Sequence, residues 1–546
     1  MKKMKTKWFR EAIGYEIYPY SFFDSNNDGF GDLKGIIEKL GYLSELGVNL
    51  LWICPIYKSP LDDYGYDVED YYSVNEILGD NNDLVNLIDS VHQKGMKIIL
   101  DLVINHVSCE HKWFKEALKD KNSKYHDYFI FRDKPNNWMG FFSESVWTYS
   151  KELGEYYFHT FSERMPDLNW SNPQLRQEIY DVAKYYLELG VDGFRLDAIA
   201  HLAKDTSFLD SKLSKDLVLD TTKFSNRKEV FDYLKEFKEE VFDHYDCLTI
   251  GEVGGEASTE MALEYTKYID MVFNFDTCWE NGAYGSIGKS DEEIKTNLVN
   301  LKALFKKWFD ACHHKCDMPL YWLNHDHPRV VSQYGSIEYR EESAKMLGAV
   351  LLFMYGLPFI YQGEELGMSN VTYDRIEDFF EDVSARNLVK NGEYDEQTLL
   401  RFLRRCSRIS ARSPMQWNTK SHAGFSKEHP YIKVNDNYLM VNAEANLSER
   451  DSIYNFYKSC IEIRKENNEL VYYGSFELID PNDEDLFTYK KQYKDEELLV
   501  IANFSPKLKK IKVDSDYSLL ISNQQEDITK LGSFGVCIFK KHIHKC

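Results

Sequence analysis

The sequence repeats one local pattern eight times: a short apolar run is followed by a segment in which apolar residues recur at helical spacing. Short, uniformly apolar strands that alternate with helices are typical of a parallel sheet covered on its faces. Eight such units predict a closed β/α barrel rather than an open sheet. The expected strands are 11–18, 49–54, 97–103, 193–196, 248–250, 271–275, 320–323 and 358–361, and the expected helices are 33–46, 84–94, 173–189, 230–242, 259–268, 294–309 and 341–354.

Two stretches interrupt this alternation. Residues 105–172, between the third and fourth strands, are rich in aromatic and charged residues, and we expect a small inserted domain there. Residues 369–447 are polar and irregular, whereas an alternation typical of antiparallel strands starts near residue 471. The expected fold class is therefore α/β: a (β/α)8 TIM barrel of residues 1–104 and 173–465, an inserted B domain at 105–172 after strand 3, and a C-terminal antiparallel β-sandwich domain at 466–546.

Charge and apolar patterning exclude several classes of partner. The chain has 66 basic and 89 acidic residues and a net charge of −23, which opposes binding to nucleic acid or to an anionic membrane. No apolar run approaches the roughly 18 residues of a membrane span, and no signal-peptide pattern follows the first lysines. Ten scattered cysteines fit a reducing compartment. We therefore expect a cytoplasmic protein, a monomer or weak homodimer, with no nucleic-acid or membrane partner.

Acidic residues stand where three of the expected strands end. Asp197 closes the fourth strand, Glu252 follows the fifth and Asp326 follows the seventh, with His106 and His325 at the ends of the third and seventh. Reactive groups of β/α barrels sit at the carboxyl ends of the strands, so these side chains should converge on one pocket. Converging acids without clustered thiols or a Gly-rich phosphate loop favour glycoside hydrolysis, in which one acid attacks and another donates a proton.

The sequence around each acid indicates its role. Arg195 and Asp197 point the same way from their strand, and attraction by the arginine is expected to lower the pKa of Asp197 and keep it charged for attack. An isolated pair of this kind is more often structural, but the two further acids favour catalysis. Glu252 has no adjacent base and follows an apolar strand, so its pKa should rise and suit a proton donor. Asp326 is left to bind sugar hydroxyls and to stabilise positive charge.

Several segments, spread from about Trp8 to beyond Asn467, match a known set of motifs: Asp101–His106, Met165–Trp170, Gly193–Asp197, Gly251–Glu252, Asn324–Asp326, Tyr361–Gly367 and Ala411–Trp417. As a set they resemble the α-amylase superfamily, glycoside hydrolase family 13, and within it the α-glucosidase and oligo-1,6-glucosidase group. The resemblance implies that Asp197 is the nucleophile, Glu252 the acid/base and Asp326 the transition-state stabiliser, in agreement with the roles inferred from the residues.

The resemblance also implies which residues line the subsite for the terminal glucose. Tyr66 would stack on the sugar ring, while Asp63 and Arg412 would bind the non-reducing 4-hydroxyl, close the pocket and make the enzyme exo-acting. The full implied set is Asp63, Tyr66, His106, Arg195, His325 and Arg412. The implied substrate is a small oligosaccharide or disaccharide.

The loop that begins at Asp24 is a candidate metal site. Its side-chain oxygens alternate with glycines, so the chain could wrap a hard cation, but Gly35 stands at the twelfth position where an EF-hand needs Glu. A polar turn that caps the helix starting near Leu33 explains the spacing equally well. Members of the resembled group bind calcium here, which implies a structural Ca2+ and no organic cofactor. The implied ligands are Asp24, Asn26, Asp28 and Asp32 with the carbonyl of Phe30.

Departures from the family pattern concern the linkage that is cleaved. Ala198 stands where 1,6-preferring members typically have valine, and it resembles the maltases that prefer 1,4 linkages. Residues 253–255 also differ from the oligo-1,6-glucosidase pattern. We therefore expect a retaining exo-α-glucosidase that prefers maltose-type α-1,4 substrates. The alternatives are an oligo-1,6-glucosidase, a sucrose or trehalose-6-phosphate hydrolase, a sucrose isomerase and, from another class, a non-catalytic barrel that assists a transporter or binds carbohydrate.

Overall fold

A parallel barrel of eight strands forms the centre of the molecule. The computed structural model describes residues 7–277, 280, 287–290, 292–524 and 529–543, so the expected domain limits at residues 1 and 546 lie outside it. The strands follow the order β11-β10-β9-β5-β2-β1-β13-β12, and β11 and β12, at the two ends of this order, are in contact and close the barrel. This confirms the expected fold class. The strands are β1 (Gly14–Ile17), β2 (Leu50–Ile53), β5 (Lys97–Val103), β9 (Gly193–Asp197), β10 (Leu248–Glu252), β11 (Met271–Phe273), β12 (Pro319–Leu320) and β13 (Leu357–Tyr361).

Helices cover the outside of the barrel, and their ends follow local sequence signals. Asp32 caps the first turn of α1 by accepting from the Gly35 amide, and Gly47 ends that helix in the left-handed conformation. Asn297 caps α7, so this helix begins four residues later than its apolar pattern predicts. The covering helices are α1 (Leu33–Leu46), α2 (Asn81–Gln93), α4 (Pro173–Glu188), α5 (Glu229–Glu240), α6 (Thr259–Tyr265), α7 (Leu298–Cys312), α8 (Val330–Gln333) and α9 (Arg340–Leu352).

The start of β9 is fixed by a close backbone approach. Gly193 has a φ of +149°, and a Cβ atom at this position would lie 2.0 Å from the carbonyl oxygen of Leu248 on β10. Only glycine fits there, since any side chain would push the two strands apart. The glycine therefore sets the register that brings Asp197 and Glu252 to neighbouring strand ends.

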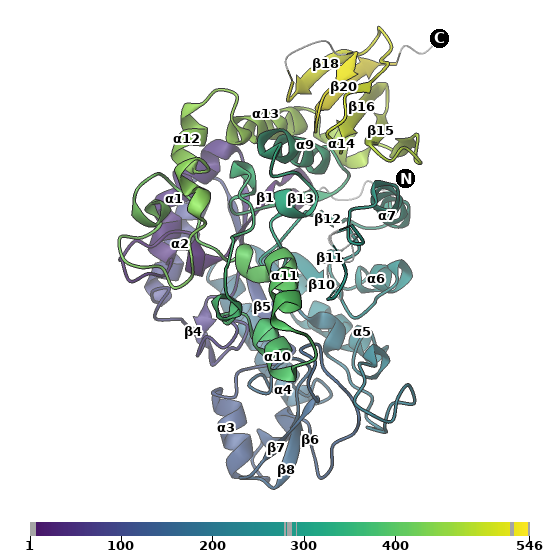
Figure 1. Cartoon of the computed structure of the whole chain (residues 1–546). Coiled ribbons are helices and arrows are strands. Elements are labelled where there is room, and N and C mark those ends of the chain that lie inside the picture. The colour runs from purple at the N-terminus through teal and green to yellow at the C-terminus, as the bar shows by residue number, and fades with distance from the viewer. Residues whose placement is uncertain (1–6, 278–279, 281–286, 291, 525–528, 544–546) are drawn as a thin grey trace.

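The segment between β5 and β9 forms a separate lobe, seen at the bottom of Figure 1. It contains α3 (Lys112–Lys119) and the antiparallel strands β6 (Phe131–Arg132), β7 (Trp147–Ser150) and β8 (Glu155–Phe158) in the order β6-β8-β7. A buried ammonium ties the lobe to the barrel: Nζ of Lys204 lies 2.8 Å from Asp167 Oδ2 and 3.1 Å from Asn105 Oδ1. The lobe is thereby anchored at the barrel mouth.

The irregular segment after β13 also reaches this mouth. It contains α10 (Val383–Asn391), α11 (Glu396–Cys406) and α12 (Ala443–Ser448). Figure 1 shows α10 and α11 in front of the barrel, just above the lobe. Asn387 on α10 donates to the carbonyl of Phe142 in the lobe, and Lys390 pairs with Glu144 at 2.7 Å. Two segments far apart in the sequence therefore cover one end of the barrel.

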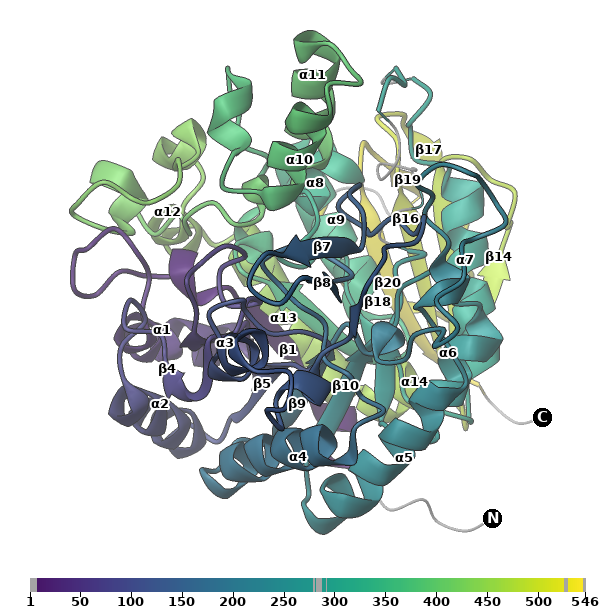
Figure 2. The ribbon, with the colours of Figure 1, turned by 90° about the horizontal axis from the view of Figure 1, so that it is seen from below.

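The C-terminal part is antiparallel, as its alternating pattern predicts. After α13 (Ile453–Glu466) and α14 (Asn468–Tyr473), a five-stranded sheet runs in the order β14-β15-β16-β20-β18, with β17 and β19 as a separate pair. Figures 1 and 2 show this sheet on the side of the barrel away from the lobe. The strands are β14 (Glu477–Ile479), β15 (Leu486–Tyr493), β16 (Glu496–Asn503), β17 (Lys509–Lys510), β18 (Ser518–Ser522), β19 (Lys530–Leu531) and β20 (Val536–His542), and the remaining pair outside the barrel is β3 (Tyr57–Lys58) with β4 (Asp70–Val74).

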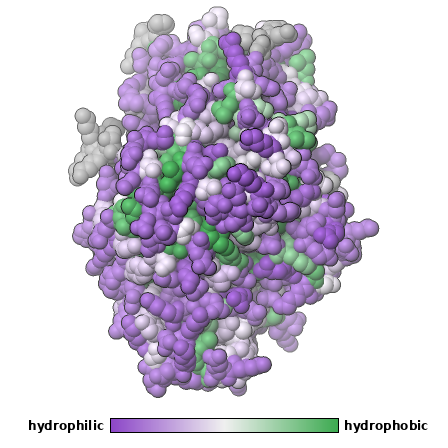
Figure 3. Space-filling model, turned by 90° about the vertical axis from the view of Figure 1, so that its left-hand side faces the viewer, coloured by the Kyte–Doolittle hydropathy of each residue, from purple (hydrophilic) through white to green (hydrophobic). Residues whose placement is uncertain are grey.

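The outer surface shown in Figure 3 is mainly hydrophilic, with apolar residues scattered singly or in small groups. Within the described ranges, no helix has the length and apolar character needed to cross a bilayer.

Candidate active site

One large cavity opens at the carboxyl ends of the barrel strands. Its volume is about 1370 Å³, and Asp197, Glu252 and Asp326 all border it. Asp197 is the last residue of β9, Glu252 is the last residue of β10, and Asp326 lies in the loop after β12. The structure therefore brings together the three acids that the strand-end rule selects.

The guanidinium of Arg195 joins two of these acids. Its Nη1 lies 2.5 Å from Asp197 Oδ1 and 2.8 Å from Asp101 Oδ1, and its Nη2 lies 2.5 Å from Glu252 Oε2. The arginine is buried, so its charge acts through little solvent. Glu252 has no base beside it in the sequence, but Arg195 from the neighbouring strand supplies one in the structure.

Burial raises the pKa of both carboxyl groups. Loss of solvation raises the pKa of Glu252 to about 7, against the attraction of Arg195, so the predicted rise is confirmed. The same loss of solvation raises the pKa of Asp197 to about 6, although Arg195 acts in the opposite direction. The expectation of a lowered pKa at Asp197 is therefore wrong, because sequence spacing shows the arginine but not the burial. Asp197 nevertheless stays the stronger acid of the pair.

Asp326 is surrounded by positive charge. Its Oδ2 lies 3.0 Å from His325 Nε2, and its Oδ1 lies 2.8 Å from Arg412 Nη2 and 3.1 Å from Arg408 Nη1. Burial by itself would raise the pKa of Asp326, but these three cations outweigh it and hold the pKa well below its usual value. Asp326 is thus a permanent anion next to the two titrating acids.

The same two arginines also bind Asp63, which borders the cavity together with Arg408. Arg408 Nη2 lies 2.9 Å and Arg412 Nη1 3.4 Å from Asp63 Oδ1, and Arg408 Nε lies 3.0 Å from Asp382 Oδ1. Sequence reasoning missed Arg408 and Asp382. The available signal was the spacing of Arg408 and Arg412, which places both side chains on one side of a helical turn.

The remaining expected residues divide between the cavity wall and the layer behind it. Asp63, Tyr66 and His106 border the cavity, as expected. Tyr66 donates to Asp101 at 3.0 Å and stacks on His325, and burial lowers the pKa of His106, which keeps its ring neutral. The other three are not among the residues that border it in the described structure, but each contacts one of the acids, and their role in the glucose subsite stays a prediction. These are Arg195, His325 and Arg412.

Several aromatic rings form part of the cavity wall. Phe141, Phe142 and Phe161 come from the lobe, and Phe275 follows β11. Sequence reasoning assigned the many aromatic residues of the lobe to no individual position, because nothing in their spacing shows which of them face the barrel. Flat apolar rings suit the faces of sugar rings, so this wall fits a carbohydrate.

The loop from Asp24 to Asp32 closes on itself by hydrogen bonds. Asp24 accepts from the amides of Asn27 and Gly29 at 2.6 and 2.9 Å, and Asp32 caps α1. The capping interpretation is thus fulfilled by Asp32. The five expected ligands all offer oxygen atoms, the donor type that Ca2+ takes, so their chemistry also fits this ion. Calcium binding stays a prediction.

Comparisons with known proteins agree with this geometry. The family described as "Alpha amylase, catalytic domain" matches residues 16–474. The oligo-1,6-glucosidase of Bacillus cereus is 43% identical over 541 residues, which are 95% of this chain and 96% of that enzyme. The glucan 1,6-alpha-glucosidase of Streptococcus pneumoniae is 39% identical over 530 residues, with 95% and 96% covered.

Solved structures show the same fold over the whole chain. The trehalose-6-phosphate hydrolase of Bacillus licheniformis superimposes with a TM-score of 0.90 at 36% identity and covers 98% of this chain and 100% of that one. The isomaltulose synthase of Klebsiella sp. LX3 superimposes with a TM-score of 0.91 at 31% identity, with 98% and 100% covered. Three acids that border one cavity at the strand ends of such a barrel, together with the family match, lead to one conclusion: the chain belongs to the alpha-amylase family and is a glycoside hydrolase.

Proposed function

We propose that this protein is a retaining, exo-acting α-glucosidase that releases glucose from the non-reducing end of short α-1,6-linked oligosaccharides. The observation that carries this proposal is the pairing of Asp197 and Glu252, both of which border one cavity, on the guanidinium of Arg195. The linkage preference is taken from the relatives, which are oligo-1,6-glucosidases and a glucan 1,6-alpha-glucosidase.

The pairing of the two acids supports retention of configuration. Both carboxyl groups reach neighbouring nitrogens of Arg195, and a hydrogen bond from Glu252 to Asp197 lowers the pKa of Asp197 and raises that of Glu252. Retaining enzymes hold their two carboxyl groups about 5–5.5 Å apart, whereas inverting enzymes leave about 6.5–9.5 Å for a water molecule. Two groups that share one guanidinium and one hydrogen bond leave no space for that water.

The different acidities assign the steps. Asp197, the stronger acid, attacks the anomeric carbon as a carboxylate, and Glu252, protonated up to about pH 7, donates its proton to the departing oxygen. The glucosyl–Asp197 ester is then hydrolysed by a water molecule that Glu252, now ionised, deprotonates. Asp326 remains an anion throughout and stabilises the positive charge of the oxocarbenium-like transition state.

The cluster of Arg408, Arg412, Asp63 and Asp326 at the cavity supports exo action. Four charged side chains bound to one another would block a chain from extending beyond the terminal glucose. Carboxylate and guanidinium groups in this position can hydrogen-bond the 4-hydroxyl of a non-reducing glucose. A substrate would therefore enter with that end first.

The maltose-type preference suggested by Ala198 has less support. The relatives that match nearly the full chain carry names of 1,6-acting enzymes, and this favours the oligo-1,6-glucosidase that was one of the alternatives. The experiment is a comparison of kcat/KM for isomaltose, maltose, sucrose and trehalose 6-phosphate with the purified protein, with chromatography of the products. Isomaltose should give the highest value and free glucose as the product. A higher value for any other substrate, or an isomerised disaccharide as main product, would contradict the proposal.

We also propose that the loop from Asp24 to Asp32 holds a structural Ca2+. The oxygen-only donor set supports this, and so does the exposure of Asn26 and Asp28, which an ion can reach from solvent. The loop lies between β1 and α1, away from the three acids in the sequence, so the ion would stabilise the fold and take no part in bond cleavage.

A further inference from the structure

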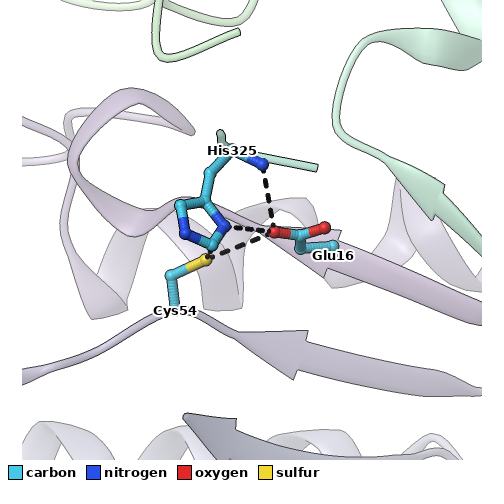
Figure 4. A group of neighbouring side chains, drawn as sticks. All are labelled: Glu16, Cys54 and His325. Carbon is cyan, nitrogen blue, oxygen red and sulfur yellow. Dashed lines mark hydrogen bonds and ion pairs between the residues drawn. The ribbon is translucent and has the colours of Figure 1, made fainter. Parts of the chain in front are cut away.

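A buried group of three ionisable side chains lies behind Asp326. Glu16 is on β1, Cys54 follows β2 and His325 precedes Asp326, and Figure 4 shows their reactive atoms turned toward one another. Glu16 Oε1 lies 2.7 Å from His325 Nδ1, and Cys54 Sγ lies 3.5 Å from both of these atoms. All three side chains are inaccessible to solvent. None of them is one of the three acids to which the proposed mechanism assigns a chemical step.

The short contact in this group holds a proton rather than a metal ion. Two ligands of a tetrahedral zinc site, each about 2.0 Å from the ion, are separated by about 3.3 Å. The distance of 2.7 Å between Glu16 Oε1 and His325 Nδ1 is that of a charge-assisted hydrogen bond. The group is therefore best described as a hydrogen-bonded chain.

Two donors converge on a single oxygen of Glu16. Oε1 accepts from the His325 backbone amide at 3.3 Å and from the Cys54 thiol at 3.5 Å, and it lies 2.7 Å from His325 Nδ1. An oxygen that accepts from these donors acts as a carboxylate oxygen, so the proton of the short contact belongs to Nδ1. Burial raises the pKa of Glu16, and His325 acts against this rise. The other ring nitrogen, Nε2, lies 3.0 Å from Asp326 Oδ2 without hydrogen-bond geometry, and it needs a proton as well, because two bare acceptors would repel each other.

We propose that Glu16 is a positioning residue that keeps His325 doubly protonated, so that the positive charge of its ring, 3.0 Å from Asp326 Oδ2, holds Asp326 in place beneath the sugar even in alkaline solution. This inference rests on the role proposed above for Asp326. Glu16 supplies the negative charge that balances the imidazolium on the side away from the cavity, and Asp326 balances it on the side toward the cavity. Without Glu16, the imidazole would lose a proton at lower pH and could then present a bare nitrogen to Asp326.

The electrostatic surroundings of His325 support this arrangement. Burial by itself lowers the pKa of His325, but the charge of Asp326 and the interaction with Cys54 outweigh burial and raise the pKa well above its usual value. Arg412 donates to the backbone oxygen of His325 at 3.1 Å and opposes the imidazolium charge. The titratable and charged groups that face His325 or Glu16 from all packed elements are Tyr18, Cys54, Tyr66, Asp101, Arg195, Asp326, His327, Tyr361 and Arg412.

The test is the pH dependence of Glu16→Gln, assayed with 4-nitrophenyl α-glucoside so that linkage preference plays no part. The amide keeps the shape of the side chain and an acceptor for Nδ1, but removes the charge. At about pH 6, kcat of the variant should stay within about threefold of that of the unmodified enzyme. At about pH 8.5 it should be at least about tenfold lower, because the pKa of His325 falls by more than one unit when the charge of Glu16 is removed. Glu365→Gln is the matched control, because Glu365 is an equally buried carboxyl group whose partners are Tyr15 and Tyr42.

A constant ratio of the two kcat values across this pH range would overturn the inference, whatever the effect on the melting temperature. A second measurement does not depend on turnover: NMR of 15N-histidine-labelled protein, with His325 assigned from its absence in His325→Asn. Both ring N–H groups of His325 should persist at about pH 8.5 in the unmodified protein, and Glu16→Gln should lose one of them. An unmodified protein with these N–H groups but no turnover would count against the proposed function alone. Normal turnover with a singly protonated His325 would count against this inference alone.

Discussion

Asp197 and Glu252 bind the two terminal nitrogens of one guanidinium, that of Arg195, at 2.5 Å each. One cation therefore stabilises the ionised forms of both acids, and burial acts against it at both positions. The outcome is a pair of groups that titrate near neutral pH, with Glu252 the weaker acid. This difference is what a retaining mechanism needs, because one group must be ionised while the other still carries its proton.

The acidities predict a narrow bell-shaped profile of kcat/KM against pH. Activity should rise as Asp197 ionises near its pKa of about 6 and fall as Glu252 loses its proton near its pKa of about 7. The two ionisations belong to the coupled pair, so the limbs report the pair as a whole. Steady-state kinetics in a constant-ionic-strength buffer series checks this. A plateau that extends beyond about pH 9 would contradict the role of Glu252 as acid.

Azide should distinguish the two acids. Glu252→Ala and Asp197→Ala should each lower kcat by at least about 10³-fold on an unactivated disaccharide. With a 4-nitrophenyl substrate and azide, Glu252→Ala should give the α-glucosyl azide, because the covalent intermediate still forms, whereas Asp197→Ala should give the β-glucosyl azide by direct attack. NMR of the products identifies the anomer. The same anomer from both variants would show that the roles are wrongly assigned.

Arg408 should be essential for both stability and substrate binding. It contacts Asp63, Asp326 and Asp382, and its removal would leave the buried carboxylate of Asp382 without the cation that it pairs with, which costs about 3–5 kcal/mol. Arg408→Lys should recover little, because an ammonium cannot bridge three carboxylates in a fixed geometry. Thermal unfolding and KM for isomaltose measure the two effects. Arg375→Ala is the control: its pair with Asp378 is on the surface, and its loss should change neither quantity measurably.

Calcium should raise the melting temperature if the loop from Asp24 to Asp32 binds it. The calcium site and the capping turn are the two interpretations of this loop, and they predict different effects of a change at Asp28. The side chain of Asp28 is exposed and only closes the turn. Asp28→Ala should abolish the calcium-dependent shift and have little effect in chelator, whereas Asp32→Ala should abolish the shift and also cost about 1 kcal/mol in chelator, because it removes the cap of α1 as well as a ligand. Equal melting curves with calcium and with chelator would leave capping as the function of the loop.

The residue after the nucleophile should affect linkage preference at a cost in stability. Ala198 has a φ of +49° and a ψ of +31°, in the left-handed region, where a β-branched side chain is strained. Ala198→Val should raise the ratio of kcat/KM for isomaltose to that for maltose, in line with the valine of 1,6-preferring members, and lower the stability by about 1–2 kcal/mol. Ala198→Gly is the control for the strain. An unchanged ratio would show that Ala198 does not determine linkage.

The barrel could be predicted from the sequence because its signals are local. The bounds of α1 (Leu33–Leu46) and β5 (Lys97–Val103) agree with the expected ones to the residue, since a cap, a terminal glycine and an uninterrupted apolar run fix them. Asp197, Glu252 and Asp326 could be selected for the same reason: each follows a strand that the pattern identifies.

The rest of the site depends on contacts between distant segments. Arg408 lies in an irregular segment and meets Asp63, 345 positions earlier in the chain, so no periodicity indicates the contact. The expected lowering of the pKa of Asp197 is wrong for a related reason. An arginine two residues away is visible in the sequence, whereas the burial that raises this pKa is not. Phe141 and Phe142 border the cavity only because the lobe is anchored at the barrel mouth.

Trapping of the covalent intermediate tests the central claim most directly. The enzyme is incubated with 5-fluoro-α-D-glucosyl fluoride, which slows hydrolysis of the intermediate, and is then digested and analysed by mass spectrometry. The peptide that contains Asp197 should carry the fluoroglucosyl group. A label on Glu252 or Asp326, or a protein that turns the reagent over without any covalent adduct, would contradict the account.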